Sequence, residues 1–519
     1  MPTLDWIGKQ AVVNHHREVP TRLLHCDSAL SAGDPESGNL LVEGDNLEAL
    51  KALLPYYAGK VKCIYIDPPY NTGNEGWVYN DNVNSPEIRS WLGKVVGKEA
   101  EDLSRHDKWL CMIYPRLRLL RDFLSEDGII FISIDSYEFH NLKFICDDIF
   151  GRTQNIATLV WKRRGNPDSR NVNGVSEDHE YVICYGRSPA SKFKGAQRDT
   201  TKYTNPDADI RGPWMSDNLT GLAGPNERPN LHYEVVHPEN GTRYPPHPSR
   251  GWAVAPATMQ RLITERRILW PKLATGRPRI KRFQYEIQAE TTGFSSILSA
   301  PTNETGTREL NAIFGDKVFA FPKPSEMVRT LIEQATASGD LILDSFSGSG
   351  TTGVATDRIG EGRKFILVEL DTAIARNVTA ERLKRSDLKS GFRYCTLGKP
   401  LFDEWGTVTA GVTYADLAAF VFFSETGSPI PAKADGTTTL LGCFGDRAVH
   451  LLWNADSAGV ASDRAGNVLT PETFAKLPRV SAEFSGPVVV YAEGCTVTPE
   501  RLADAGVTFK QIPYQVVGA

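Results

Sequence analysis

The stretch Lys62-Cys63-Ile64-Tyr65-Ile66-Asp67-Pro68-Pro69-Tyr70 decides the fold of the chain. Its first five residues form an apolar and aromatic run that is typical of a buried strand. Two successive prolines cannot continue a hydrogen-bonded ladder, so we expect the chain to leave the sheet at Asp67. Open α/β sheets bind their ligands beyond the carboxyl ends of their strands. A carboxylate, backbone carbonyls and a phenol ring are therefore expected at a ligand-binding edge.

The residue types of this Asp-Pro-Pro-Tyr turn suit an exocyclic amino group on a flat base. The lone pair of such an amine is delocalised into its ring, so it attacks a methyl donor only when acceptors hold its hydrogens. The carboxylate of Asp67 and the carbonyl of Pro68 are candidate acceptors, and Tyr70 could stack on a base drawn out of its duplex. An ordinary turn at the end of a strand remains the alternative, because four-residue motifs also match by chance.

A second motif lies far downstream. Leu341 to Asp344 reads as a strand, Ser345 to Gly350 as a glycine-rich loop and Thr351 to Ile359 as a helix. Gly348, Gly350 and Gly353 have the G-x-G-x-x-G spacing that lets a ligand approach the backbone and the helix N-terminus. The next strand, Lys364 to Val368, ends at Glu369, which is placed to hold the hydroxyls of a ribose. The pattern predicts a nucleotide-like cofactor.

Charge indicates which cofactor this is. Asp344 at the mouth of the loop would repel a diphosphate but attract the ammonium group of S-adenosyl-L-methionine. The loop also lacks the lysine of a phosphate-binding G-x-x-x-x-G-K-[ST] motif. S-adenosyl-L-methionine is therefore favoured over NAD or ATP.

At this point the sequence resembles the S-adenosylmethionine-dependent DNA amino-methyltransferases of the β arrangement, in which D-P-P-Y precedes an F-x-G-x-G loop. The matching residues are Asp67, Pro68, Pro69 and Tyr70, then Phe346, Ser347, Gly348 and Gly350, with Glu43-Gly44-Asp45-Asn46 and Phe321-Pro322-Lys323-Pro324 ahead of the two motifs. The resemblance covers roughly residues 36 to 388 and is closest to the modification subunits of type III restriction-modification systems.

The resemblance implies a function and a set of site residues. It implies transfer of a methyl group to N6 of adenine in duplex DNA by base flipping, within a restriction-modification or phage-defence system. Cytosine N4 remains an alternative, although the cytosine enzymes more often have Ser at the position of Asp67. A third reading is a DNA-binding specificity subunit of a larger restriction complex. The cofactor would be contacted by Asp45, Asn46, Lys323, Asp344, Phe346, Ser347, Gly348, Gly350, Thr351 and Glu369.

Two of these residues also have a simpler reading. Asp45 would accept from the adenine amino group of the cofactor, but an acid here is equally the N-cap of a helix over Leu47 to Leu54. Lys323 is expected at the methionine end of the cofactor, although a Pro-Lys-Pro segment ahead of a helix is also a common structural feature.

The fold class implied is a class I, Rossmann-like α/β fold with a mostly parallel sheet and a permuted motif order. We expect an N-terminal arm (1–35), a first catalytic part (36–190), a target recognition domain (191–310), a second catalytic part (311–388) and a C-terminal α/β domain for dimerisation or docking (389–519). Asn71 to Ser85 reads as a lid over a flipped base. Asp178-His179-Glu180 has no metal-site context and reads as the structural start of a strand.

The middle of the chain is the expected DNA-reading region. Arg261 to Arg282 holds eight Lys or Arg against one acid, Glu265, and Trp161 to Arg170 adds four more. Such a basic stripe suits phosphate contact, although a charge run is usually a solvated face. Candidate DNA contacts are Arg163, Arg164, Trp214, Arg266, Arg267, Arg279, Lys281 and Arg282.

Composition limits the remaining possibilities. The chain has 519 residues and a formal net charge of −5, so DNA contact must come from local basic patches. Its eight cysteines show no metal-ligand spacing and are expected to be reduced thiols of a cytoplasmic, prokaryotic, DNA-associated protein, with no metal. No apolar run is long enough to span a membrane. The expected partners are double-stranded DNA, a second copy in a homodimer, and a separate helicase-nuclease restriction subunit, because no helicase or nuclease motif is present here.

Overall fold

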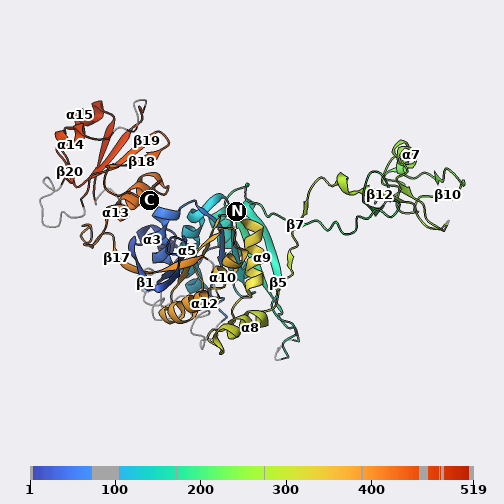
Figure 1. Cartoon of the computed structure of the whole chain (residues 1–519), viewed down its shortest axis with the longest axis horizontal. Coiled ribbons are helices and arrows are strands. Elements are labelled where there is room, and N and C mark those ends of the chain that lie inside the picture. Colours follow the sequence, from blue (N-terminus) through green and yellow to red (C-terminus); the bar gives the residue numbers. More distant parts are fainter. Residues whose placement is uncertain are drawn as a thin grey trace. The chain divides into compact units, whose positions relative to one another are not determined.

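The computed structural model describes residues 4–72, 105–169, 174–273, 275–386, 388, 390–454, 466–478, 480 and 484–512. The chain divides into two compact units, one built from residues 1–194 and 295–519 and the other from Gly195–Phe294 (Figure 1). The predicted lid, Asn71 to Ser85, lies outside the described residues except for its first two positions.

The first unit is built on a ten-stranded sheet. Its strands, in spatial order, are β1 (Arg22–Gly33), β17 (Gly391–Pro400), β2 (Leu40–Glu43), β16 (Lys364–Glu369), β15 (Leu341–Asp344), β3 (Val61–Ile66), β4 (Leu124–Ile134), β6 (His179–Gly186), β5 (Asn155–Lys162) and β14 (Ile297–Leu298). The strands from β17 to β4 are parallel, whereas β1 and β6 run antiparallel to their neighbours. This mostly parallel sheet confirms the predicted fold class.

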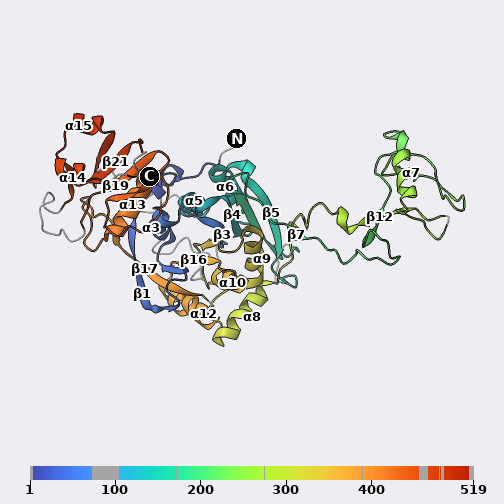
Figure 2. The ribbon, with the colours of Figure 1, turned by 45° about the horizontal axis from the view of Figure 1, so that its top comes forward.

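Helices cover both faces of the sheet (Figure 2). One face carries α3 (Asn46–Tyr57) and α5 (Arg105–Phe123), and the other carries α10 (Thr351–Ile359) and α12 (Glu381–Arg385). Successive strand residues point to opposite faces. Accordingly, Leu40 and Val42 pack in the core with α3 and α5, while Leu41 packs with Val354 and Leu383. Both faces are buried, which explains the continuous apolar runs of these strands.

The two motifs meet because their strands are neighbours. β15 pairs in parallel with β3, so that Ile342 lies opposite Cys63 and Leu343 opposite Ile64. Parallel strands end at the same edge of the sheet, and Asp67 therefore lies close to Asp344, although the two motifs are far apart in the sequence. Adjacent strands therefore build the pocket, although the two motifs follow a permuted order along the chain.

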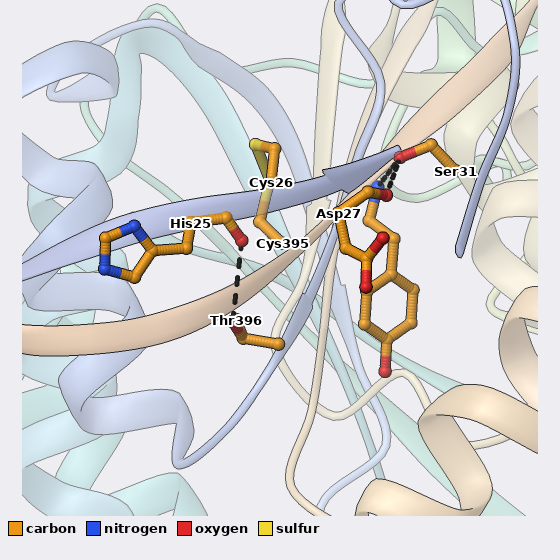
Figure 3. The surroundings of a disulfide bond; sticks show 7 residues. His25, Cys26, Asp27, Ser31, Cys395 and Thr396 are labelled. Atoms are coloured by element: carbon orange, nitrogen blue, oxygen red, sulfur yellow. Dashed lines mark hydrogen bonds between the residues drawn. A yellow bond between two sulfur atoms is a disulfide. The ribbon is translucent and has the colours of Figure 1, made fainter. Parts of the chain in front are cut away.

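The N-terminal segment differs from the expected arm. Residues 22–33 form β1, which pairs antiparallel with β17 at the edge of the sheet, and Val12 is buried in the core with α5. Cys26 and Cys395 lie opposite each other in this pair and form a disulfide, so the prediction of eight reduced thiols is wrong for these two (Figure 3). Sequence periodicity could not reveal β1 because an exposed edge strand carries polar residues on both faces.

The second unit is shorter than the predicted 191–310. Its ends pair as β7 (Ala196–Gln197) and β13 (Thr291–Thr292), and it contains a three-stranded sheet of β11 (Ile268–Leu269), β12 (Arg279–Phe283) and β8 (Trp214–Asn218), and helix α7 (Pro256–Thr264). The segment after residue 294 returns to the first unit, where β14 joins the large sheet. A two-residue strand has no periodicity that sequence reading could detect.

The C-terminal region begins later than the predicted residue 389, because β17 still belongs to the large sheet. It has a four-stranded sheet of β18 (Leu440–Phe444), β19 (Arg447–Leu451), β21 (Val488–Ala492) and β23 (Val507–Gln511), with α13 (Tyr414–Thr426) and α15 (Pro499–Asp504). These elements are of the α/β kind that was predicted, and a separate domain for dimerisation or docking stays a prediction. In the part of the chain that the structure describes, no helix is long and apolar enough to cross a membrane.

Candidate active site

The catalytic tetrapeptide forms a tightly held turn where β3 ends. The hydroxyl of Tyr70 donates to Oδ1 of Asp67 at 2.7 Å. The indole N–H of Trp109, from α5, donates to the carbonyl of Pro69 at 2.6 Å. Asn71 follows with a left-handed φ of 59°, and its amide donates to the buried carboxylate of Glu138. A non-glycine residue in this conformation persists only when its surroundings hold it, so the turn is pre-organised.

Lys323 lies against this turn. Its Nζ donates to both oxygens of Asp67 at 2.8 Å and to the hydroxyl of Tyr70 at 2.7 Å. Burial alone lowers the pKa of a lysine, but the negative charges of Asp67 and Glu180 outweigh it and raise the pKa of Lys323 above its ordinary value. Lys323 is therefore a charged residue beside the carboxylate that is predicted to bind the target amine. Its assignment to the cofactor is still a prediction, which the structure leaves open.

Glu180 was missed as a site residue. It is the second residue of β6, in agreement with the reading of Asp178-His179-Glu180 as a strand start, but its side chain is 3% exposed and contacts Tyr70 of the Asp-Pro-Pro-Tyr turn. Oε2 accepts from Tyr70 at 3.1 Å and lies 3.4 Å from Nζ of Lys323, while Oε1 pairs with Arg163 at 3.3 Å. An acid inside the apolar run His179–Gly186 was the available signal, because a glutamate is rarely buried without partners.

The glycine-rich loop is shaped by backbone conformations that favour glycine. Gly348 has a φ of 48° and Gly350, the N-cap of α10, a φ of 77°. Gly353 allows close packing, since a Cβ there would approach the side chain of Leu383 to 2.8 Å. The backbone N–H of Gly348 donates to Oε2 of Glu369 at 2.9 Å. The loop after β15 is thus tied to the end of the neighbouring strand β16.

Asp344 and Glu369 are buried carboxyl groups at this edge. Asp344 accepts from the N–H of Phe346 at 2.9 Å and from the hydroxyl of Thr352. Burial raises the pKa of Asp344 to about 7 and raises the pKa of Glu369 well above its ordinary value. A buried carboxyl group that is costly to ionise gains most from an incoming cation. Asp344 is therefore suited to the ammonium group of an amino-acid-like ligand.

The catalytic and cofactor motifs share one pocket. Asp67, Lys323 and Asp344 line it together with the loop residues Phe346, Ser347, Gly348, Ser349, Thr351 and Thr352, and with Tyr65, Phe319, Phe321 and Pro322. The hydroxyl of Thr351 also donates to the carbonyl of Lys323 at 3.3 Å. The structure therefore brings the predicted reacting carboxylate and most of the predicted cofactor loop to one cavity.

Asp45 and Asn46 hold the scaffold beside this pocket. Oδ1 of Asp45 accepts from the N–H of Leu47 at 2.8 Å, so Asp45 caps α3, and its other oxygen pairs with Arg116 at 2.8 Å. The amide of Asn46 donates to the carbonyl of Ser345 at 2.9 Å. The capping reading of Asp45 is confirmed, and Asn46 joins the start of α3 to the cofactor loop. A contact of either residue with a cofactor stays a prediction.

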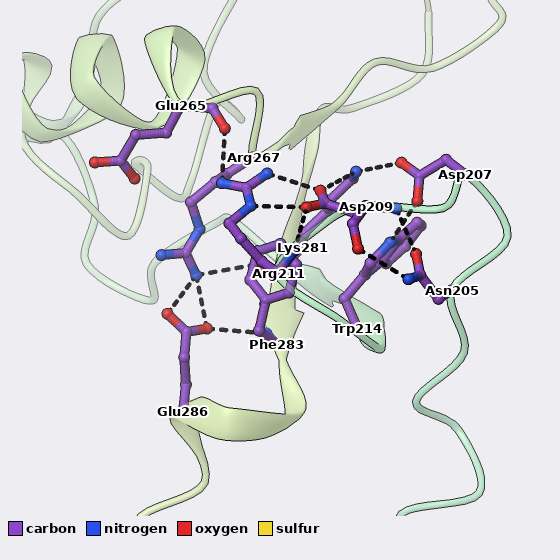
Figure 4. A network of polar contacts seen from close by, with 10 residues as sticks. All are labelled: Asn205, Asp207, Asp209, Arg211, Trp214, Glu265, Arg267, Lys281, Phe283 and Glu286. Carbon is purple, nitrogen blue, oxygen red and sulfur yellow. Dashed lines mark hydrogen bonds and ion pairs between the residues drawn. The ribbon is translucent and has the colours of Figure 1, made fainter.

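Three of the predicted DNA contacts, Trp214, Arg267 and Lys281, are bound by acidic side chains of the second unit itself (Figure 4). Lys281 is 6% exposed and its ammonium group pairs with Asp207 and, at 3.0 Å, with Asp209. Trp214 donates to Asp207 at 2.8 Å, and Arg267 pairs with Glu286 at 2.6 Å. The prediction of Lys281 as a phosphate contact is wrong, because a buried, paired ammonium group serves the core of this unit.

The side chains of the other predicted DNA contacts differ in their exposure and in their hydrogen-bond partners. Arg279 donates to Ser216 at 2.7 Å, and Arg282, 52% exposed, pairs with Asp217 at 3.2 Å. Arg266 is exposed, with a left-handed φ of 51°. Arg164, in the first unit, pairs with Asp168 at 2.6 Å, and Arg163 is drawn into the active site by Glu180. Exposed guanidinium groups such as those of Arg266 and Arg282 retain the capacity to contact phosphates.

In the described part of the chain, no group of three or more His, Cys, Asp or Glu side chains is arranged to hold a metal ion.

Comparison with known proteins agrees with this geometry. Residues 61–381 match the model of the N6/N4 methyltransferase family, described as DNA methylase. The chain is 32% identical to the type III restriction-modification enzyme StyLTI Mod subunit of Salmonella typhimurium, covering 73% of this chain and 60% of that one. It is 33% identical to the EcoP15I Mod subunit of Escherichia coli, covering 71% and 64%.

A further relative is covered over most of its length. The type II methyltransferase M.KpnI of Klebsiella pneumoniae is 31% identical, with 70% of this chain and 86% of that one covered. The chain spans about three fifths of the length of the two Mod subunits. The matched region contains both β3 with its Asp-Pro-Pro-Tyr turn and the glycine loop after β15. The chain therefore belongs to the N6/N4 family of DNA methylases.

Proposed function

We propose that the chain methylates an exocyclic amino group of a base in duplex DNA, with S-adenosyl-L-methionine as methyl donor and N6 of adenine as the target. The observation that carries this proposal is the pocket shared by Asp67 and the glycine loop. An acceptor for amine hydrogens and a loop for a nucleotide-like cofactor are the two parts that such a transfer needs. The family and its Mod and M.KpnI relatives support the same conclusion.

The chain's residues fit the cofactor. Asp344 offers a carboxylate to an ammonium group, and Glu369 stands at the end of the next strand, where nucleotide-binding folds hold a ribose. The glycine-rich loop after Asp344, Ser345 to Gly350, has no lysine or arginine that would select a phosphate. When bound, S-adenosyl-L-methionine supplies an electrophilic methyl group.

The protein's part in the reaction is to bind and orient the amine. An oxygen of Asp67 and the carbonyl of Pro68 accept its two hydrogens, which draws the nitrogen lone pair out of conjugation with the base. Tyr70 presents an aromatic ring on which an extruded base stacks. No covalent intermediate with the protein is needed, so the contributions are orientation and electrostatic stabilisation.

Adenine is proposed over cytosine because position 67 is an aspartate, whereas cytosine enzymes of similar motif order more often carry serine. The second unit, Gly195–Phe294, is proposed to read the DNA sequence, since it is inserted between the two motifs. We propose a cytoplasmic protein that forms a homodimer. We further propose that it works with a separate restriction subunit, which the names of its relatives support, since they are Mod subunits of restriction-modification enzymes.

The test is incubation with labelled S-adenosyl-L-methionine and mixed genomic DNA, followed by mass spectrometry of the nucleosides. Labelled N6-methyladenosine is expected. Labelled N4-methylcytosine would overturn the base assignment but not the reaction. Cofactor binding without any labelled nucleoside would contradict the proposed activity and favour a DNA-binding specificity subunit.

A further inference from the structure

The acceptor that the target amine requires is already occupied. Both oxygens of Asp67 accept from Lys323 at 2.8 Å, and Oδ1 also accepts from Tyr70 at 2.7 Å. Oδ1 thus accepts two hydrogen bonds and Oδ2 one, so an amino group that enters the pocket competes with these donors for the carboxylate. A charged ammonium group forms stronger hydrogen bonds than a neutral aromatic amine. Lys323 is therefore the donor that most hinders binding of the target amine to Asp67.

A second carboxylate lies close enough to accept the ammonium group when it leaves Asp67. Oε2 of Glu180 lies 3.4 Å from Nζ of Lys323, and both side chains are buried. A lysine that left Asp67 without another partner would be an isolated charge in a buried site, which is costly. Glu180 removes that cost, because Lys323 has only a short way to move from one acid to the other.

The charges around Glu180 fit this role. Arg163 pairs with its other oxygen at 3.3 Å, so two acids and two bases form one neutral cluster. Tyr70 can donate its single hydrogen to Asp67 at 2.7 Å or to Glu180 at 3.1 Å. Nζ also lies 4.9 Å from the centre of the Tyr70 ring, which stabilises the cation along this path. Both donors on Asp67 therefore have an alternative acceptor on the same residue.

Resting on the proposed function, we infer that Glu180 is a positioning residue that holds Lys323 away from Asp67 during methyl transfer, so that Asp67 accepts the hydrogens of the target amine. While no base is bound, Lys323 stays hydrogen-bonded to Asp67. Glu180 acts through Lys323 and does not contact the reacting atoms.

The experiment compares Glu180→Gln, Lys323→Met and the double variant in single-turnover methylation at saturating DNA and cofactor. Glu180→Gln is expected to slow transfer by about a hundredfold, the usual effect of a misplaced catalytic group. Its calorimetric affinity for S-adenosyl-L-methionine and its KM for DNA should stay unchanged. In the Lys323→Met background, where no ammonium group competes for Asp67, the same change should cost less than about threefold. Glu180→Asp, which keeps the charge, should recover part of the rate.

Glu177→Gln is the matched control, since Glu177 is exposed on the same segment and its carboxylate contacts Ser136. Thermal unfolding shows whether each variant is folded, and Glu180→Asp carries the test if Glu180→Gln is not. Equal losses in both backgrounds, or a loss of cofactor affinity, would overturn the inference while leaving the proposed function intact. A wild-type protein that methylates no DNA would overturn both.

Discussion

The buried carboxylate of Glu369 accepts a hydrogen bond from the backbone N–H of Gly348 at 2.9 Å, which ties the cofactor loop to the neighbouring strand. Glu369→Gln keeps the size of the side chain but weakens this bond and the acceptor offered to a ribose. We expect about tenfold weaker binding of S-adenosyl-L-methionine, as is usual for a lost hydrogen bond. Calorimetry measures it, with Glu381→Gln, a partly exposed acid on α12, as control. Unchanged affinity would remove Glu369 from the cofactor site.

Asp67→Ala should abolish methyl transfer and leave cofactor binding largely intact. Asp67 lies beyond the end of β3 and faces Lys323, whereas the loop that holds the cofactor is built on β15 and β16. Methylation with labelled cofactor and calorimetry on the same sample separate the two effects. Equal loss of both would show that Asp67 supports the pocket and not the reaction.

The cofactor affinity should depend on pH through Asp344. Its pKa is raised by burial to about 7, so the carboxyl group becomes negatively charged as the pH rises through that value. Between pH 6 and 7 the ionised fraction increases about fivefold, and affinity for a ligand with an ammonium group should increase by the same factor. Calorimetry at these two values is the measurement. Asp344→Asn should bind weakly at both, and a wild-type affinity independent of pH would contradict the assignment.

The same group affects the stability of the cofactor-free protein. From about pH 4 to 7 the folded protein binds a proton at Asp344 that the unfolded chain releases, because the ordinary pKa of 3.8 is lower than the folded one. The contribution is therefore present at low pH and is lost as the pH rises through this window. Asp344→Asn should remove this part of the slope. Denaturant unfolding at several pH values checks it, and identical slopes would count against the raised pKa.

In the second unit, Lys281→Met should affect stability, whereas Arg266→Gln should affect DNA binding. Lys281 is buried between Asp207 and Asp209, so its loss leaves two carboxylates without their cation and should lower the melting temperature of this unit by several degrees. Arg266 is exposed, and its loss should leave stability unchanged but reduce the salt dependence of DNA binding by about one counterion. Anisotropy titrations at several salt concentrations, together with calorimetric melting, distinguish the two. An unchanged salt slope would exclude Arg266 from phosphate contact.

Reduction of the bond between Cys26 and Cys395 should destabilise the first unit. The two residues are 369 positions apart, and chain entropy predicts an upper limit of about 6 kcal/mol for closing such a loop. Denaturant unfolding with and without dithiothreitol measures the difference, with Cys26→Ser as the matched variant. The bond joins β1 to β17 at the edge of the sheet, whereas the candidate active site is built on β3 and β15, so activity should not depend on the bond. Loss of methylation on reduction would contradict this.

The sequence by itself determined the two motifs and the strands that carry them. Two prolines after an apolar run end β3, and a glycine loop with an acid-terminated next strand defines β15, α10 and β16 at the predicted residues. These are local consequences of missing N–H groups, glycine conformations and apolar periodicity, which need no knowledge of the rest of the fold.

The tertiary structure alone decided which charges meet. Glu180 reaches Lys323 because β6 lies beside β4 in the sheet, and Arg163 reaches Glu180 because β5 pairs with β6. Lys281 is buried in the second unit, where β12 pairs with β8. Whether a charged side chain is solvated or paired depends on strands that are distant in the chain. The sequence around a basic residue looks the same whether its side chain is solvated or paired. The sequence thus located the chemistry, and the packing of neighbouring strands assigned each charge its partner.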